Sequence, residues 1–120
     1  MNRLKGKIVL VIGAAGAIGS AIAGAVQEQG GTAITSDLAG RGDVAHALDV
    51  TSEADWLRVI AAIEESAGRL DGLVNAAGIV AVGSVEDTDF ATWHRVLAVN
   101  LDGTFLGCKH AMRLIRRNGG

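Results

Sequence analysis

The fold of this 120-residue chain is decided by the stretch Ile8-Val9-Leu10-Val11-Ile12-Gly13-Ala14-Ala15-Gly16-Ala17-Ile18-Gly19. Its first five residues are aliphatic without alternation, which is typical of a strand buried on both faces of a parallel sheet. Glycines then recur every third residue, where the helical pattern of residues 17–29 begins. Such glycines permit a tight turn, close approach of backbone N–H groups to a phosphate, and close helix–strand packing. The stretch predicts a strand–loop–helix unit with an anion site at the helix N-terminus.

Strands and helices continue to alternate along the rest of the chain. The further strands are predicted at residues 32–36, 44–48 and 70–77. One further helix begins after a cap at Thr51 or Ser52, and a long one begins after Thr88 or Asp89 and continues almost to a turn at 118–120. This order predicts parallel strands joined by right-handed crossovers. We therefore expect an α/β fold with a Rossmann-like doubly wound sheet of about four strands, in the order 3-2-1-4.

Both later helices carry an apolar stripe at three- and four-residue spacing. The first stripe is formed by Trp56, Ile60, Ile63 and Ala67. The second is formed by Phe90, Trp93, Leu97, Leu101, Phe105, Cys108, Met112 and Ile115. We expect both stripes, with their tryptophans, to pack in the core, and the second can extend into a subunit interface.

Composition excludes several classes of protein. Acidic and basic residues interleave to a net charge of −2, which argues against a nucleic-acid surface. Cys108 is the only cysteine, so an internal disulfide is impossible and a reducing compartment fits. The three histidines lack the spacing of a metal site, and no apolar run is long enough for a membrane span. We expect a soluble cytoplasmic protein without a metal.

An acid at the end of the second predicted strand points to a dinucleotide. Asp37 follows the glycine loop by about 20 residues, where a carboxylate accepts hydrogen bonds from a ribose diol. A glycine turn without a ligand is the alternative. A carboxylate also repels a 2′-phosphate, and Leu38 offers no positive charge to attract one. The pattern favours NAD over NADP, with the nearby Arg41 keeping NADP open.

These motifs resemble the short-chain dehydrogenase/reductase family across essentially the whole chain. The loop is similar to the family's Thr-Gly-x-x-x-Gly-x-Gly, but Ile12 replaces the threonine and Ala17 the middle glycine. Gly16 comes one position early, a spacing more typical of the family's extended branch. The later motifs are Asp49-Val50, Asn75-Ala76-Ala77-Gly78 and Val99-Asn100-Leu101-Asp102-Gly103.

The resemblance assigns roles to individual positions. Asp49 and Val50 would lie beside the adenine, residues 75–78 beside the adenosine ribose, and Asn100 would hold a water in a proton relay. A polar residue that merely disturbs a long helix is the alternative for Asn100. The implied cofactor-binding residues are Gly13, Ala15, Gly16, Ala17, Ile18, Gly19, Asp37, Leu38, Asp49, Val50, Asn75, Ala76, Ala77 and Gly78.

The activity that the resemblance implies is NAD-dependent oxidation of a secondary alcohol or reduction of the ketone. The substrate would be a small molecule, with steroids and cyclic alcohols as the candidates that the resemblance suggests. The parent enzyme would be a homo-oligomer. Two alternatives stay open: a non-catalytic nucleotide-binding or regulatory protein, and part of an extended-branch sugar-nucleotide epimerase.

The family's base, a tyrosine in Tyr-x-x-x-Lys, has no counterpart because the chain contains no tyrosine. We therefore expect residues 1–120 to form a single cofactor-binding domain, the N-terminal portion of such an enzyme. The chain is expected to end before the fifth strand and to be inactive alone. We also expect marginal stability, because residues 73–77 would form an open sheet edge.

Overall fold

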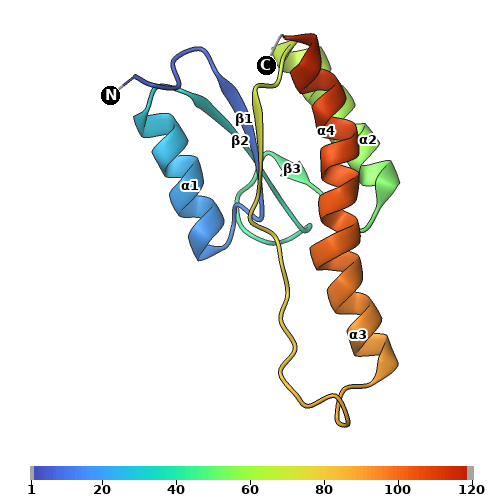
Figure 1. Cartoon of the computed structure of the whole chain (residues 1–120). Coiled ribbons are helices and arrows are strands. Elements are labelled where there is room, and N and C mark those ends of the chain that lie inside the picture. Colours follow the sequence, from blue (N-terminus) through green and yellow to red (C-terminus); the bar gives the residue numbers. More distant parts are fainter. Residues whose placement is uncertain (1, 119–120) are drawn as a thin grey trace.

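The computed structural model of the chain describes residues 2–118, at the centre of which lies a parallel four-stranded sheet in the order β3-β2-β1-β4 (Figure 1). The strands are β1 (Ile8–Ile12), β2 (Thr32–Asp37), β3 (His46–Ala47) and β4 (Gly72–Asn75). The predicted α/β fold and strand order are confirmed. β1 pairs with β2 on one side and with β4 on the other, so the quoted stretch forms the centre of the domain.

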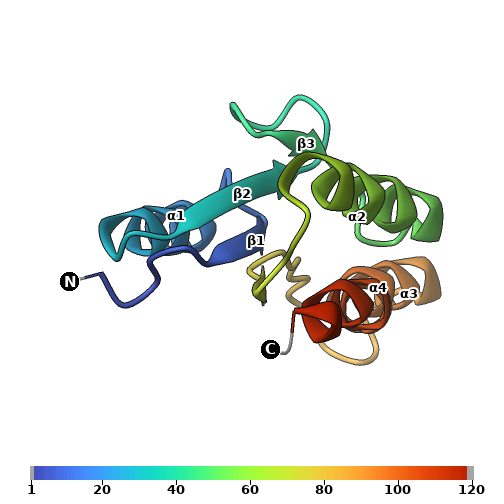
Figure 2. The ribbon, with the colours of Figure 1, turned by 90° about the horizontal axis from the view of Figure 1, so that it is seen from above.

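Helices cover both faces of the sheet (Figure 2). One face is covered by α1 (Ala17–Glu28). The other face is covered by α2 (Glu53–Ala67) and by one long helix made of α3 (Phe90–Leu97), the π-helical segment η1 (Ala98–Asp102) and α4 (Gly103–Arg117). Val9 and Val11 of β1 pack toward α1, whereas Leu10 and Ile12 pack toward α2 and α4. This two-sided burial explains the unbroken apolar run. Within residues 2–118, no helix is long and apolar enough to cross a membrane.

Two predicted strands are shorter than expected. The strand predicted at 70–77 is β4, Gly72–Asn75, because its partner β1 ends at Ile12 and Gly13 then turns the chain away with φ +77°. The strand predicted at 44–48 is β3, His46–Ala47, because only Ser36 and Asp37 of β2 pair with it. A strand can extend only as far as its partner supplies hydrogen bonds.

The helix starts are resolved by capping hydrogen bonds. Ser52, and not Thr51, caps α2, because its hydroxyl accepts from the N–H of Asp55 at 3.2 Å. Asp89, and not Thr88, caps α3, because its carboxylate accepts from the N–H of Thr92 at 2.7 Å. At the other end of the chain, Asn118 ends α4, and the rest of the turn predicted at 118–120 lies outside the described residues.

The first apolar stripe is buried as expected, with Trp56 fully inaccessible, but the expectation for the second is wrong. Trp93 is 55% exposed, and the other exposed members of that stripe are Phe90, Leu97, Leu101, Phe105, Cys108 and Met112. The long helix instead packs through a different face of α4, whose buried residues are Gly103, Gly107, His110, Ala111 and Leu114. A Cβ on Gly107 would lie 2.8 Å from the Trp56 ring. Glycine is therefore what permits the two helices to approach so closely.

Asp71 ties the start of β1 to the start of β4. Its carboxylate, 10% exposed, accepts from the N–H of Ile8 at 2.8 Å and from two nitrogens of Arg69 at 2.6 and 3.0 Å. The hydrogen bonds from Arg69, and after them the bond from Ile8, hold the pKa of Asp71 below its ordinary value. A carboxyl group with a lowered pKa in the folded state stabilises that state only while it is ionised.

Substituting Asp71→Asn is therefore expected to destabilise the fold at pH 7 and to have less effect in acid. The folded-state pKa lies below the unfolded-state value of about 3.9, so the stabilisation is complete above that pH and disappears as the pH falls through the folded-state pKa. Urea unfolding of both chains at pH 7 and pH 3, roughly three units above and one unit below the unfolded-state pKa, measures this. An equal stability difference at both pH values would contradict it. The exposed Asp43→Asn serves as control.

Candidate functional site

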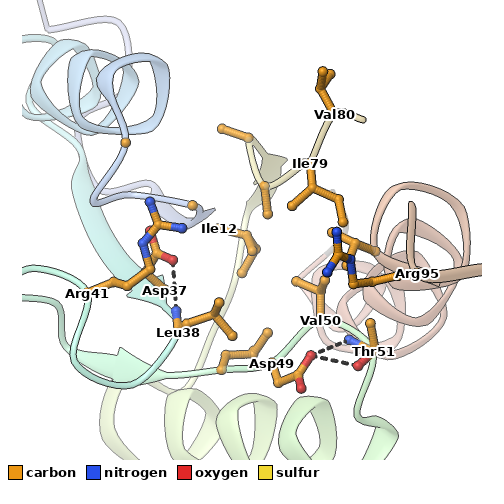
Figure 3. Close-up of a pocket in the computed structure, with 17 residues that line it drawn as sticks. Ile12, Asp37, Leu38, Arg41, Asp49, Val50, Thr51, Ile79, Val80 and Arg95 are labelled. Atoms are coloured by element: carbon orange, nitrogen blue, oxygen red, sulfur yellow. Dashed lines mark hydrogen bonds between the residues drawn. The ribbon is translucent and has the colours of Figure 1, made fainter. Parts of the chain in front are cut away.

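A cavity of about 620 Å³ opens at the carboxyl ends of β1, β2 and β4 (Figure 3). Ligands of doubly wound sheets bind at this end of the strands. Nine of the residues singled out from the sequence line it: Gly13, Gly16, Asp37, Leu38, Asp49, Val50, Ala76, Ala77 and Gly78. The cavity therefore gathers motifs that lie far apart in the sequence.

The three loop glycines are needed for different reasons. Gly13 has φ +77°, and a Cβ there would lie 2.7 Å from the Ala77 nitrogen. A Cβ on Gly19 would collide with the carbonyl oxygen of Gly13. At Gly16, by contrast, the nearest atom would be 3.4 Å away, an ordinary contact, so the packing of the chain itself leaves room for a side chain. Gly16 lines the cavity, where a Cβ would fill space that a phosphate needs.

The N-terminus of α1 has no side-chain cap, unlike those of α2 and α3. Gly16 occupies the cap position, makes no side-chain bond, and no acid follows in the first turn. The N-terminus of α2, in contrast, has Ser52 as its cap and Glu53 and Asp55 in its first turn. The partial positive charge and free N–H groups of α1 are therefore available to an anion. Together with the space left by the missing side chain of Gly16, the N-terminus of α1 fits a pyrophosphate.

Asp37 joins the loop to the second strand. Its carboxylate, 8% exposed as a residue, accepts from the N–H of Ala15 at 3.0 Å and from the N–H of Leu38 at 2.8 Å. Each carboxylate oxygen keeps a second lone pair, which can accept from a ribose hydroxyl. Figure 3 shows Asp37 and Arg41 on the same side of the cavity. Asp37 thus holds the loop in shape and contributes negative charge to the cavity.

The facing wall follows β3. Asp49 accepts from the N–H and hydroxyl of Thr51 at 2.9 and 2.7 Å, the two bonds drawn in Figure 3. Val50 is buried, and its carbonyl accepts from the Trp56 indole at 2.9 Å. Val99 of η1 also lines the cavity. Val50 and Val99 thus give the cavity an aliphatic surface, and the bond from Trp56 ties Val50 to the core.

Asn75 and Asn100 lie beside the cavity and bond to the backbone of Ala77 and Ile79, which line it. Asn75 donates to the Thr104 hydroxyl at 2.8 Å and accepts from the N–H of Ala77 at 3.2 Å. The Asn100 amide pairs with the backbone of Ile79, donating at 2.8 Å and accepting at 2.9 Å. Asn100 also lies within η1, where the helix is widened to the π form. The hydrogen-bonding pattern of the helix is therefore irregular at Asn100, as the alternative expects. The side chain of Asn100 also holds the backbone of Ile79, which lines the cavity.

Several of the site residues predicted from the sequence lie outside the lining of the cavity. Those that do not line the cavity are Ala15, Ala17, Ile18, Gly19, Asn75 and Asn100. The prediction also missed five lining residues, namely Leu48, Thr51, Ile79, Val80 and Arg95. Arg95 could have been found, because it precedes Val99 by one helical turn and therefore shares its face.

Comparisons with known proteins agree with this geometry. The family profile described as Enoyl-(Acyl carrier protein) reductase matches residues 13–120. The chain is 40% identical to 2-(S)-hydroxypropyl-CoM dehydrogenase 3 of Xanthobacter autotrophicus, covering 92% of this chain and 49% of that one. It is 34% identical to the 3-beta-hydroxysteroid dehydrogenase of Comamonas testosteroni, covering 99% and 51%.

A solved structure extends the likeness to three dimensions. The short chain dehydrogenase from Mycobacterium smegmatis superposes with a TM-score of 0.89 at 35% identity, covering 98% of this chain and 55% of that one. The chain spans about half the length of the curated relatives it matches. The family profile, the dehydrogenase relatives and the solved structure all match this chain, and its glycine loop and sheet order fit them. The chain therefore belongs to the short-chain dehydrogenase/reductase family.

Proposed function

We propose that residues 1–120 form the NAD-binding domain of an oxidoreductase that interconverts a secondary alcohol and its ketone. The observation that carries the proposal is the cavity in which an uncapped helix N-terminus, a glycine cradle and a carboxylate meet. Members of the family bind a nicotinamide cofactor, and the relatives reported above are dehydrogenases, which favours this activity over an epimerase. The substrate would be a small alcohol or ketone, a steroid or cyclic alcohol among the candidates, and the assembly a homo-oligomer.

The binding roles follow the walls of the cavity. The loop from Gly13 to Gly19 with the start of α1 would hold the pyrophosphate, and Asp37 the ribose diol. Asp49 and Val50 on one wall and Leu38 on the other would enclose the adenine, with residues 75–78 beside the adenosine ribose. Asp37, Asp49 and Val50 are already held by bonds within the chain, so little ordering of them would accompany binding.

The chemistry divides between the cofactor and the protein. A bound nicotinamide supplies a hydride acceptor or donor. In this chain, Asn100 would support a proton relay, from a position fixed by its two bonds to Ile79. The chain has no tyrosine to act as a base. We therefore propose that these residues bind the cofactor without turnover, which is also what the alternative of a non-catalytic nucleotide-binding protein would show.

NAD is proposed over NADP because of the charge at Asp37. A 2′-phosphate would add negative charge where the carboxylate lines the cavity, and unscreened like charges at short range repel strongly. Arg41 lies on the same side and would soften that repulsion. Whether the site prefers NAD or NADP therefore depends on the carboxylate of Asp37.

Substituting Asp37→Asn is expected to weaken NAD binding by about 10- to 100-fold, the value of a hydrogen bond to a charged acceptor. The gap between NAD and NADP should narrow in the same variant, since the repulsion is removed. Isothermal titration calorimetry of both nucleotides with both chains measures this. Asp43→Asn removes an exposed acid outside the cavity and should bind as the unchanged chain does. An unchanged NAD affinity in Asp37→Asn, or tighter NADP than NAD binding to the unchanged chain, would refute the assignment.

A further inference from the structure

Arg95 is a cationic side chain in the cavity that none of the proposed binding roles uses. It belongs to the last turn of α3 and lines the cavity beside Val50 and Thr51. Figure 3 shows its guanidinium reaching from the helix toward the interior, between Ile79 and Val50. Among residues 2–118, no carboxylate lies within 4.0 Å of it. Asp89 attracts it from beyond that distance, but no ion pair or hydrogen bond within these residues fixes its position.

The helix places Arg95 in register with the aliphatic wall. Arg95 and Val99 are four residues apart in one continuous helix, so their side chains lie on the same side, one above the other. Both line the cavity, and Figure 3 shows Leu38, the residue after β2, across it from Arg95. A flat group lying between Leu38 and Val99 would thus extend beneath the Arg95 guanidinium. A guanidinium is planar and weakly hydrated, which suits it to stack on an aromatic face.

The opposite side of the cavity is where phosphates would bind. The uncapped start of α1 at Gly16 and the ribose acceptor Asp37 belong to the β1 and β2 side, whereas Arg95 comes from α3. Figure 3 shows Asp37 and Arg41 across the cavity from Arg95. A role for Arg95 in binding the pyrophosphate is therefore disfavoured by its position.

We infer that Arg95 is an adenine-binding residue, whose guanidinium stacks on the face of the base of the bound dinucleotide. The inference rests on the proposed function, because it takes the cavity to hold an adenine. It adds a cation–π contact to a site otherwise made of aliphatic side chains and one carboxylate. Arg95 would then contribute to selection for a nucleotide with a purine base.

The test measures binding of ADP-ribose by calorimetry, without any enzyme assay. Arg95→Gln is expected to weaken binding about 3- to 30-fold, the range for a cation–π contact between exposed and desolvated settings. Arg95→Tyr keeps a planar stacking group without charge and should restore most of the affinity. Arg95→Lys keeps the charge without the plane and should restore less. Arg113→Gln, the same change on α4 away from the cavity, should have no effect.

The outcomes separate this inference from the proposed function. If the unchanged chain fails to bind ADP-ribose, both are overturned. If it binds, and Asp37→Asn weakens binding while Arg95→Gln does not, the dinucleotide site stands and the role of Arg95 is wrong. If Arg95→Lys restores binding and Arg95→Tyr does not, Arg95 pairs with a phosphate and stacking is refuted. Circular dichroism of each variant tests whether the change leaves the fold intact.

Discussion

Replacing Gly19 by alanine is expected to destabilise the fold by about 3 kcal/mol and to abolish dinucleotide binding. The new Cβ would collide with the Gly13 carbonyl oxygen and lie 2.9 Å from the Ala14 Cα. Both are backbone atoms, so no rotamer change can relieve the contact and the turn between β1 and α1 must move. The gain in helix propensity, about 1 kcal/mol, is too small to offset this. Displacing the turn would also displace the N–H groups that face the cavity.

The matched control lies in the same helix. Gly24 is also a glycine of α1, but a Cβ there would meet nothing within 4 Å. Gly24→Ala should therefore raise stability by about 0.5–1 kcal/mol. Urea unfolding and ADP-ribose titration of both variants measure the contrast. Similar unfolding midpoints for the two variants, or intact nucleotide binding by Gly19→Ala, would show that the turn does not need a glycine at this position.

Substituting Trp56→Ala is expected to cost about 3–5 kcal/mol, as for a fully buried aromatic residue. The ring fills the space above Gly107, and its indole N–H is bonded to the Val50 carbonyl. Loss of the ring leaves a cavity between α2 and α4 and releases Val50, which lines the dinucleotide site. Since domains of this kind are stable by only about 5–15 kcal/mol, a large part of the total would be lost.

Trp93 offers the matched control for this substitution. It is the only other tryptophan in the chain and is 55% exposed on the outer face of α3. Trp93→Ala should change stability by no more than about 0.5 kcal/mol, the range of surface substitutions. Chemical denaturation of the two variants distinguishes core from surface. A loss at Trp93 equal to that at Trp56 would mean that the outer face of the long helix is buried in solution.

Prediction from sequence succeeded where the physics is local. The run from Ile8 to Gly19 specified a strand, a turn and a helix, because aliphatic continuity and glycine spacing act within a few residues. Helix starts were predicted to within a residue, since a cap accepts a hydrogen bond from an N–H two or three positions later. The order of strands followed from alternation and handedness, which leave few topologies.

Prediction failed where a remote partner makes the choice. The lengths of β3 and β4 depend on how much of β2 and β1 is available for pairing. The buried face of the long helix was predicted wrongly, because the large apolar residues of the stripe from Phe90 to Met112 were expected to face the core, and they are exposed. The face that packs contains Gly103 and Gly107, which allow close approach to Val50 and Trp56, beside the buried His110, Ala111 and Leu114.

The sequence by itself therefore determined the family of folds, the glycine loop and the acid that follows it. Only the tertiary structure decided which of these residues meet around one cavity, and it alone brought Arg95 to the wall opposite Asp37. The physical reason is that backbone propensities and caps are set by neighbours in the chain. The walls of a site, by contrast, are set by the packing of segments that lie tens of residues apart.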